Sequence, residues 1–275
     1  MDTNRSLLDH PLISERYFFP RRAFLPEPFW IDCGDARLAC CYYEGHPGGR
    51  TIVHFHGNGE VVADYAEDFI TIIDSMGYNC FLAEYRGYGM STGRPGLVTM
   101  LDDVVPIIRA IDQRTEDLIL FGRSLGSICA IHAAWRFPRI GALILESAIA
   151  NPLERLLIRI HPEEIGSTAD ALADAVDEVI NHPTKLGSYE GPLLLLHCKY
   201  DGLVDVSHAD RLRSWAGGPV TTRIFSRGDH NSILQVNSHA YFKEIDGFLR
   251  EHRLWPASCP LPGGSGAAGP GVFPR

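Results

Sequence analysis

A serine between two glycines is the sharpest chemical signal in this sequence. Gly122-Arg123-Ser124-Leu125-Gly126 follows the apolar run 118–121 and precedes a segment with helical spacing. On such a strand-to-helix turn a hydroxyl is presented for nucleophilic attack, and the flanking Gly122 and Gly126 allow a tight turn. Backbone N–H groups at the helix start favour a developing negative charge. The pattern predicts a nucleophile at Ser124, and the alternative interpretation is a small-residue turn with a buried serine.

A serine nucleophile requires a general base and a carboxylate that orients the base. Asp201 comes shortly after the apolar run 193–196, and His230 comes shortly after the run 222–225. Carboxyl ends of parallel strands meet at one edge of a sheet, where ligands bind. In folds that place a nucleophile on this kind of turn, the three residues also follow one another along the chain in the order Ser, Asp, His. We therefore predict a triad of Ser124, His230 as base and Asp201 as acid.

Two other carboxylates compete with Asp201 for the role of the acid. Asp205 lies near the start of the next predicted helix, where aspartate is common as a cap. Asp229 precedes His230 directly and would have to fold back onto it. Both rank below Asp201. The alternative interpretations are a turn-forming Asp201 and a surface-loop His230.

A second glycine-containing loop follows another buried strand. In His54-Phe55-His56-Gly57-Asn58-Gly59 the two histidines project from the same strand face, which raises the possibility of a metal pair. The carboxylates and further histidine that such a site needs do not follow, so we predict no metal and no other cofactor. The loop is better interpreted as an oxyanion hole, in which the backbone N–H groups of Asn58 and Leu125 stabilise a negative oxygen.

Strand and helix patterns alternate along the chain, which predicts an α/β fold with a doubly wound, mostly parallel sheet. The middle strands are continuous apolar runs, as expected for strands that helices cover on both faces. The predicted strands are 29–33, 38–43, 51–55, 78–83, 118–121, 142–145, 193–196 and 222–225. The predicted helices are 60–76, 98–111, 125–137, 171–180, 207–215 and 238–253.

Composition divides the chain into three parts. Residues 1–28 form an N-terminal extension, 29–255 form the α/β domain, and 151–191 interrupt its alternation as a short helical cap. Residues 256–275 are mostly Pro, Gly, Ser and Ala, so we expect this tail to be disordered.

Charge and composition exclude several classes of protein. The net charge of -9 argues against nucleic acid as a partner, because phosphate binding needs clustered Lys and Arg. The seven cysteines are odd in number and mostly lie in apolar runs, which favours reduced thiols packed as small core residues. There is no signal-peptide pattern and no membrane-length apolar run, so we expect a soluble cytoplasmic protein.

Taken together, these motifs resemble those of the α/β-hydrolase superfamily, and more narrowly the Bem46-like and ABHD13/ABHD17-like serine hydrolases. The resemblance spans about residues 29–253. It is carried by His56-Gly57-Asn58-Gly59, Tyr85-Arg86-Gly87-Tyr88-Gly89 with Ser91 and Gly93, Gly122-Arg123-Ser124-Leu125-Gly126, Asp201 and Gly228-Asp229-His230-Asn231. It implies an eight-stranded sheet, a small cap and hydrolysis of esters or thioesters.

We therefore expect a serine hydrolase that cleaves small-molecule carboxylic esters or thioesters through an acyl-enzyme. Tyr85, Tyr88 and Tyr200 either line its acyl pocket or pack in the core. The cap is short, which favours short to medium acyl chains. Apolar cap residues offer a groove for longer chains instead, namely Leu153, Leu156, Leu157 and Ile160. The alternatives are a peptidase or amidase of the same fold and a non-catalytic binding protein.

Overall fold

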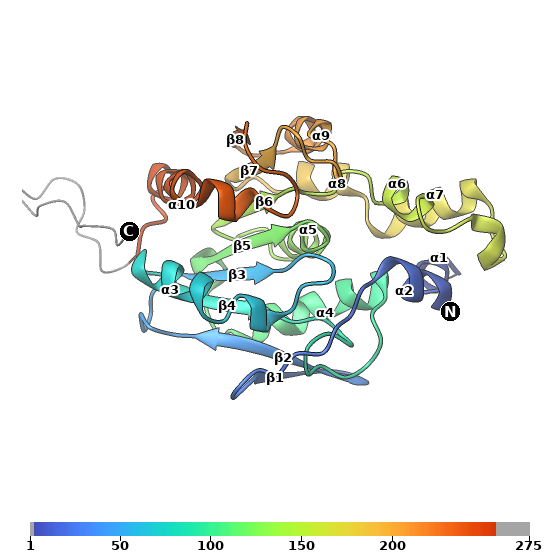
Figure 1. The fold of residues 1–275 in the computed structure, drawn as a ribbon, viewed down its shortest axis with the longest axis horizontal. Coiled ribbons are helices and arrows are strands. Elements are labelled where there is room, and N and C mark those ends of the chain that lie inside the picture. Colours follow the sequence, from blue (N-terminus) through green and yellow to red (C-terminus); the bar gives the residue numbers. More distant parts are fainter. Residues whose placement is uncertain (1–2, 257–275) are drawn as a thin grey trace, which may run out of the picture.

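Eight strands form one sheet in the computed structural model of the chain, which describes residues 3–256. Their order is β1-β2-β4-β3-β5-β6-β7-β8. β1 and β2 pair antiparallel, as do β2 and β4, and all later neighbours run parallel. The expected mostly parallel, eight-stranded, doubly wound fold is therefore confirmed (Figure 1).

The element boundaries follow the predicted ranges closely for most strands. The strands are β1 (Phe29–Cys33), β2 (Ala36–Tyr43), β3 (Thr51–Phe55), β4 (Asn79–Ala83), β5 (Leu118–Arg123), β6 (Ala142–Glu146), β7 (Leu193–Cys198) and β8 (Val220–Phe225). The helices are α1 (Thr3–Leu8), α2 (Pro11–Tyr17), α3 (Asp68–Ser75), α4 (Leu97–Ala110), α5 (Gly126–Arg136), α6 (Pro152–Leu157), α7 (Ala169–Val179), α8 (His182–Gly187), α9 (Ser207–Trp215) and α10 (Ile233–Glu251). Single 3-10 turns lie at Val62–Asp64, Thr115–Asp117 and Pro162–Ile165.

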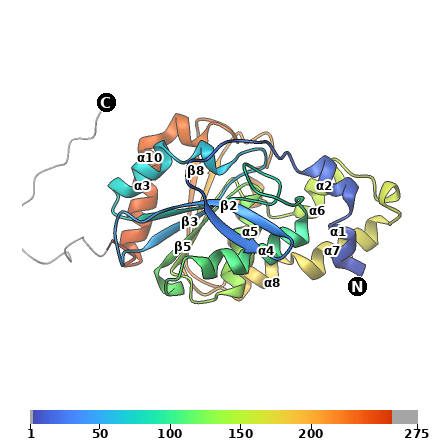
Figure 2. The ribbon, with the colours of Figure 1, turned by 90° about the horizontal axis from the view of Figure 1, so that it is seen from below.

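Helices cover both faces of the sheet, which is why its central strands are apolar throughout. α4, α5 and α8 pack on one face, while α3 and α10 pack on the other (Figure 2). α9 packs on the same face as α8. Every residue of β3, β4, β5, β6 and β7 is buried. This arrangement holds the carboxyl ends of the parallel strands at one common edge.

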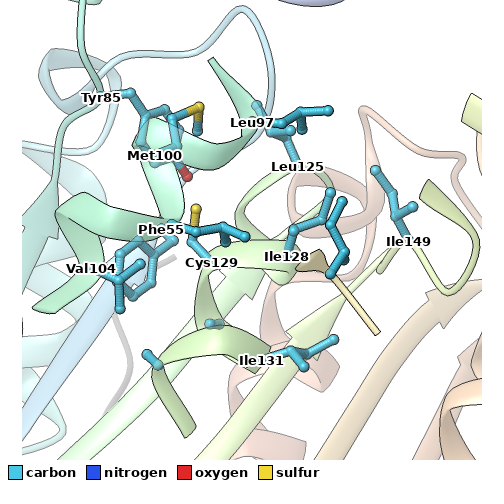
Figure 3. Close-up of a cluster of buried hydrophobic side chains, with 14 of the residues drawn as sticks. Phe55, Tyr85, Leu97, Met100, Val104, Leu125, Ile128, Cys129, Ile131 and Ile149 are labelled. Carbon is cyan, nitrogen blue, oxygen red and sulfur yellow. The ribbon is translucent and has the colours of Figure 1, made fainter. Parts of the chain in front are cut away.

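The larger hydrophobic cluster lies directly beneath the predicted nucleophile. Ile128, Cys129 and Ile131 of α5 pack there against residues of α4 and β3, and Leu125 belongs to the same cluster (Figure 3). The turn that carries Ser124 therefore packs on an apolar cluster.

The predicted helix 60–76 is wrong over its first half. α3 begins only at Asp68, and the preceding residues form a 3-10 turn in which the Asp64 carboxylate accepts a hydrogen bond from the N–H of Val61. The Glu84 carboxylate accepts a hydrogen bond from the N–H of Val62. These side-chain acceptors satisfy backbone donors outside a regular helix, which apolar spacing alone does not reveal.

The N-terminal extension packs against the cap. α1 contacts α7 and α4, and both α1 and α2 lie beyond the carboxyl edge of the sheet beside the cap helices (Figure 1). Ion pairs join Arg5 to Asp102 and Arg16 to Glu164. The expected cap, 151–191, contains α6, α7 and α8. The tail expected to be disordered falls almost entirely outside the described residues.

Six cysteines lie within the described part of the chain, and all six carry free thiols. Five of them are buried, and Cys41 is half-buried. Cys259 lies outside the described residues. Among residues 3–256 no helix has the length and apolarity needed to cross a membrane. The cytoplasmic location expected from the sequence stays a prediction.

Candidate active site

Ser124 sits at a strained turn between β5 and α5. Its φ is 49°, in the left-handed region that non-glycine residues seldom adopt. Its N–H donates to the carbonyl of Glu146 at 2.9 Å, and its carbonyl accepts from the N–H and the hydroxyl of Ser127 at 3.0 and 2.5 Å. The turn thus fixes the backbone on both sides of the hydroxyl.

The glycines flanking the serine leave no room for a side chain. A Cβ on Gly126 would lie 2.0 Å from the Phe55 carbonyl oxygen, and one on Gly122 would lie 2.7 Å from the Cβ of Ala130. α5 can pass this close to β3 and β5 only because these two positions carry no Cβ. The motif's glycines are therefore explained by packing rather than by a special φ.

Gly126→Ala is expected to destabilise the fold by about 3 kcal/mol or more, because the obstructing atoms belong to the backbone and cannot rotate away. Thermal unfolding followed by circular dichroism measures the effect. Gly247→Ala is the matched control, since a Cβ there meets nothing within 4 Å and alanine favours the helix interior. Equal melting temperatures for the two variants would contradict the packing argument.

The structure brings Ser124, His230 and Asp201 together. Nε2 of His230 lies 2.9 Å from Oγ of Ser124, and Nδ1 of His230 lies 2.8 Å from Oδ2 of Asp201. All three residues are buried, and they come from the ends of β5, β7 and β8 at one edge of the sheet. This is the geometry in which a histidine can take a proton from a serine hydroxyl.

The competing carboxylates are engaged elsewhere. Oδ1 of Asp205 accepts from the N–H of Ser207 at 3.0 Å, in an exposed turn before α9. Asp229 accepts from the backbone N–H groups of Asn231 and Ser232, both at 3.0 Å. The structure therefore places neither of them on His230.

Asp201 is held as an anion by several donors. Its Oδ1 accepts from the backbone N–H groups of Leu203 and Val204 at 2.9 and 2.8 Å, which leaves Oδ2 for His230. Burial acts to raise the pKa of Asp201, but the hydrogen bonds from His197 and His230 outweigh it and hold the pKa below its ordinary value. The carboxylate is thus ready to orient the imidazole.

Arg123, next to Ser124, links the loops that surround this serine. Its Nε lies 2.9 Å from Oε1 of Glu146, and its Nη2 donates to the carbonyl of His230 at 2.9 Å. The same guanidinium forms an ion pair with Glu60. Glu60 in turn accepts from the N–H of Gly57 at 2.6 Å. One buried arginine therefore joins the serine turn, the histidine loop and the glycine loop after β3.

A pocket of about 140 Å³ opens beside Ser124. Asn58 and Leu125, the predicted oxyanion residues, both line it. The side chain of Asn58 binds the N-terminal segment, since its Oδ1 accepts from the N–H of Phe19 at 2.9 Å and its Nδ2 donates to the Tyr17 carbonyl at 2.6 Å. Asn58 thereby anchors this segment over the pocket.

The structure does not place Tyr85, Tyr88 or Tyr200 in this pocket. Tyr85 packs in the cluster of Figure 3, where its hydroxyl donates to the carbonyl of His56 at 2.8 Å. Tyr88 is fully buried and donates to Oδ1 of Asn58 at 2.8 Å. Tyr200 is 66% exposed. Tyr85 and Tyr88 therefore pack in the core and do not line the acyl pocket, and their hydroxyls hydrogen-bond to residues of the loop after β3.

Sequence reasoning missed several residues that do line the pocket. Tyr17 and Phe19 come from the N-terminal extension, and Arg155 and Arg159 come from the cap. The aromatic run at 17–19 was the only available signal in the extension. Nothing in the sequence showed that this segment folds back over the serine, since that placement depends on the Asn58 side chain.

The two histidines of β3 and its loop have separate environments. His56 lies 2.7 Å from Oε1 of Glu84 and 2.8 Å from the Gly57 carbonyl. His54 packs among aromatic rings, and burial lowers its pKa well below the ordinary value. Among the residues that the structure describes, no group of three or more His, Cys, Asp or Glu side chains could hold a metal ion.

A larger cavity of about 470 Å³ lies between α3 and α10. It shares Arg123 and Asn231 with the smaller pocket, but Ser124, Asp201 and His230 do not line it. Pocket volume alone would therefore select a cavity that Ser124 does not line. The candidate active site is the smaller pocket, because the titratable groups in contact with the serine lie there.

The sheet order and the serine turn after β5 are those of the α/β-hydrolase fold. Residues 47–164 match the family model described as "Serine aminopeptidase, S33". The Escherichia coli K12 protein YfhR is 30% identical over 208 residues, which cover 72% of this chain and 69% of that protein. Human alpha/beta hydrolase domain-containing protein 17C is 27% identical over 179 residues, covering 63% of this chain and 51% of that protein.

Solved structures agree with this fold. The esterase Pf2001 of Pyrococcus furiosus superimposes with a TM-score of 0.66 at 16% identity, covering 86% of this chain and 98% of that chain. Mouse alpha/beta hydrolase domain-containing protein 10 gives a TM-score of 0.65 at 19% identity, covering 82% of this chain and 99% of that chain. The chain belongs to the α/β-hydrolase family.

Proposed function

We propose that this α/β hydrolase is a serine hydrolase that cleaves small-molecule carboxylic esters or thioesters through an acyl-enzyme. The observation that carries the proposal is the pair of contacts at His230, 2.9 Å to the Ser124 hydroxyl and 2.8 Å to Asp201. Together with the strained serine turn, these contacts form the arrangement that activates a serine hydroxyl.

The proposed reaction has two halves. Oγ of Ser124 attacks the substrate carbonyl while Nε2 of His230 takes the hydroxyl proton, and the N–H groups of Asn58 and Leu125 stabilise the oxyanion. His230 then gives the proton to the departing alcohol or thiol, which leaves an acyl group on Ser124. Water repeats the sequence, releasing a carboxylic acid and restoring the hydroxyl.

The substrate pocket favours esters over the peptides that an aminopeptidase cleaves. An aminopeptidase must bind the free ammonium group of its substrate, which calls for a carboxylate near the serine. Arginines line the pocket, and no Asp or Glu from the described part of the chain does so. This charge would repel an ammonium group.

The size of the pocket supports short acyl chains. Its 140 Å³ is well below the roughly 300–1,000 Å³ of pockets that enclose drug-sized ligands. Of the cap residues considered for a longer groove, Leu156 and Ile160 are buried in the core. A methylene that the pocket cannot enclose adds none of the about 0.8 kcal/mol that burial would give.

A series of p-nitrophenyl esters from acetate to palmitate tests this proposal. We expect kcat/KM to be highest for short to medium acyl chains and to fall or stay level towards palmitate. A steady rise from butyrate through laurate to palmitate would contradict the small acyl pocket. The p-nitroanilide of butyric acid is the matched amide, and turnover of this amide as fast as the butyrate ester would favour the amidase alternative.

A further inference from the structure

Two cap arginines line the pocket beside Ser124 without a carboxylate partner. Arg155 lies in α6, and Arg159 lies four residues later in the turn that follows it. Residues four apart share one side of a helical turn, and both side chains line the pocket. Among the described residues, no ion pair or hydrogen bond involves either guanidinium.

Two cap carboxylates that lie close to these arginines in sequence are paired with other cations. Glu154 lies 3.5 Å from Arg211, and Glu164 lies 2.6 Å from Arg16. Arg123 also lines the pocket, but its guanidinium is paired with carboxylates on its other side. In a chain with a net charge of -9, the pocket at the nucleophile is locally positive.

Phe19 holds the guanidinium of Arg159 in place. The Cζ of Arg159 lies 4.7 Å from the centre of the Phe19 ring. Stacking on an aromatic face restricts the side chain while its N–H donors remain free at the edge of the plane. Like charges four residues apart repel each other, so an anion between the two arginines would relieve an unfavourable contact.

We propose that the natural substrate carries a carboxylate, which Arg155 and Arg159 bind while the ester carbonyl lies at Ser124. A planar guanidinium matches a carboxylate with two parallel hydrogen bonds, and a carboxylate is compact enough for a pocket of this size. This inference rests on the proposed ester hydrolysis and defines its substrate class.

Two pairs of esters test on which side of the scissile bond the carboxylate belongs. In the first pair, the mono-p-nitrophenyl ester of glutaric acid is compared with p-nitrophenyl valerate, so the carboxylate is on the acyl side. In the second pair, 4-acetoxybenzoate is compared with phenyl acetate, so the carboxylate is on the leaving group. The ratio of kcat/KM for the charged and the neutral ester is compared between enzyme variants, so differences in intrinsic reactivity cancel.

The Arg155→Met, Arg159→Met double variant should lower this ratio by about tenfold or more for at least one pair, since charge-assisted hydrogen bonds are lost. The corresponding double lysine variant should keep more of the ratio because it keeps the charge. About 0.5 M salt should lower the wild-type ratio, since Arg159 is exposed. Arg109→Met is the matched control, because Arg109 is exposed on α4 and does not line the pocket.

An unchanged ratio for both pairs in the double methionine variant would overturn the inference. This result is distinct from failure of the proposed function, in which the wild type would hydrolyse none of the four esters. The melting temperature of each variant is measured to check that the fold is retained.

Discussion

Ser124→Ala should abolish nearly all ester hydrolysis while leaving the fold intact. Without the hydroxyl no acyl-enzyme forms, and only the roughly 10³–10⁴-fold acceleration over water from the oxyanion donors and binding should remain. The hydroxyl makes one contact with His230, whereas the turn itself is held by backbone bonds. Hydrolysis of p-nitrophenyl butyrate by the purified variant measures the loss.

Ser127→Ala is the control for this experiment, since Ser127 also carries a buried hydroxyl near the turn. That hydroxyl donates to the Ser124 carbonyl and accepts from the N–H of Ile149, so it supports the turn without reaching His230. We expect a smaller loss there than at Ser124. Wild-type turnover by Ser124→Ala, with normal circular dichroism, would exclude Ser124 as the nucleophile.

Asp201→Asn is expected to lower kcat by about 10⁴. The N–H groups of Leu203 and Val204 bind Oδ1, so the amide nitrogen of an asparagine would face Nδ1 of His230. The ring would then accept at Nδ1 and carry its proton on Nε2, where it can no longer take a proton from Ser124. Steady-state kinetics at saturating ester measures the effect.

Asp205→Asn is the matched control for Asp201→Asn. The asparagine oxygen can still accept from the N–H of Ser207 at the start of α9, as the aspartate does. We therefore expect kcat to stay within about twofold of wild type. The reverse pattern of rates would transfer the role of the acid to Asp205.

The parts of the fold that sequence could predict are those that depend on burial. Continuous apolar runs such as 193–196 predicted buried parallel strands, because only helices on both faces explain a strand without polar positions. Ser124 and Asp201 follow two such strands, β5 and β7, whereas His230 follows the partly exposed edge strand β8. Their meeting point then followed from sheet topology alone.

What sequence could not predict depends on single side-chain contacts. The late start of α3 follows from Asp64 and Glu84, which bind backbone N–H groups that a helix would otherwise use. The position of Phe19 over the pocket follows from its N–H, which donates to Oδ1 of Asn58 and to the hydroxyl of Tyr88. Apolar periodicity carries no information about such polar contacts between distant segments.

Covalent labelling with a fluorophosphonate shows whether Ser124 is an activated nucleophile, since this probe phosphonylates an activated serine and needs no knowledge of the substrate. Intact-mass spectrometry followed by peptide mapping locates the adduct. The assignment of Ser124 as the nucleophile predicts one adduct per chain, on Ser124, and none in Ser124→Ala. An unlabelled wild type, or equal labelling of wild type and Ser124→Ala, would contradict it.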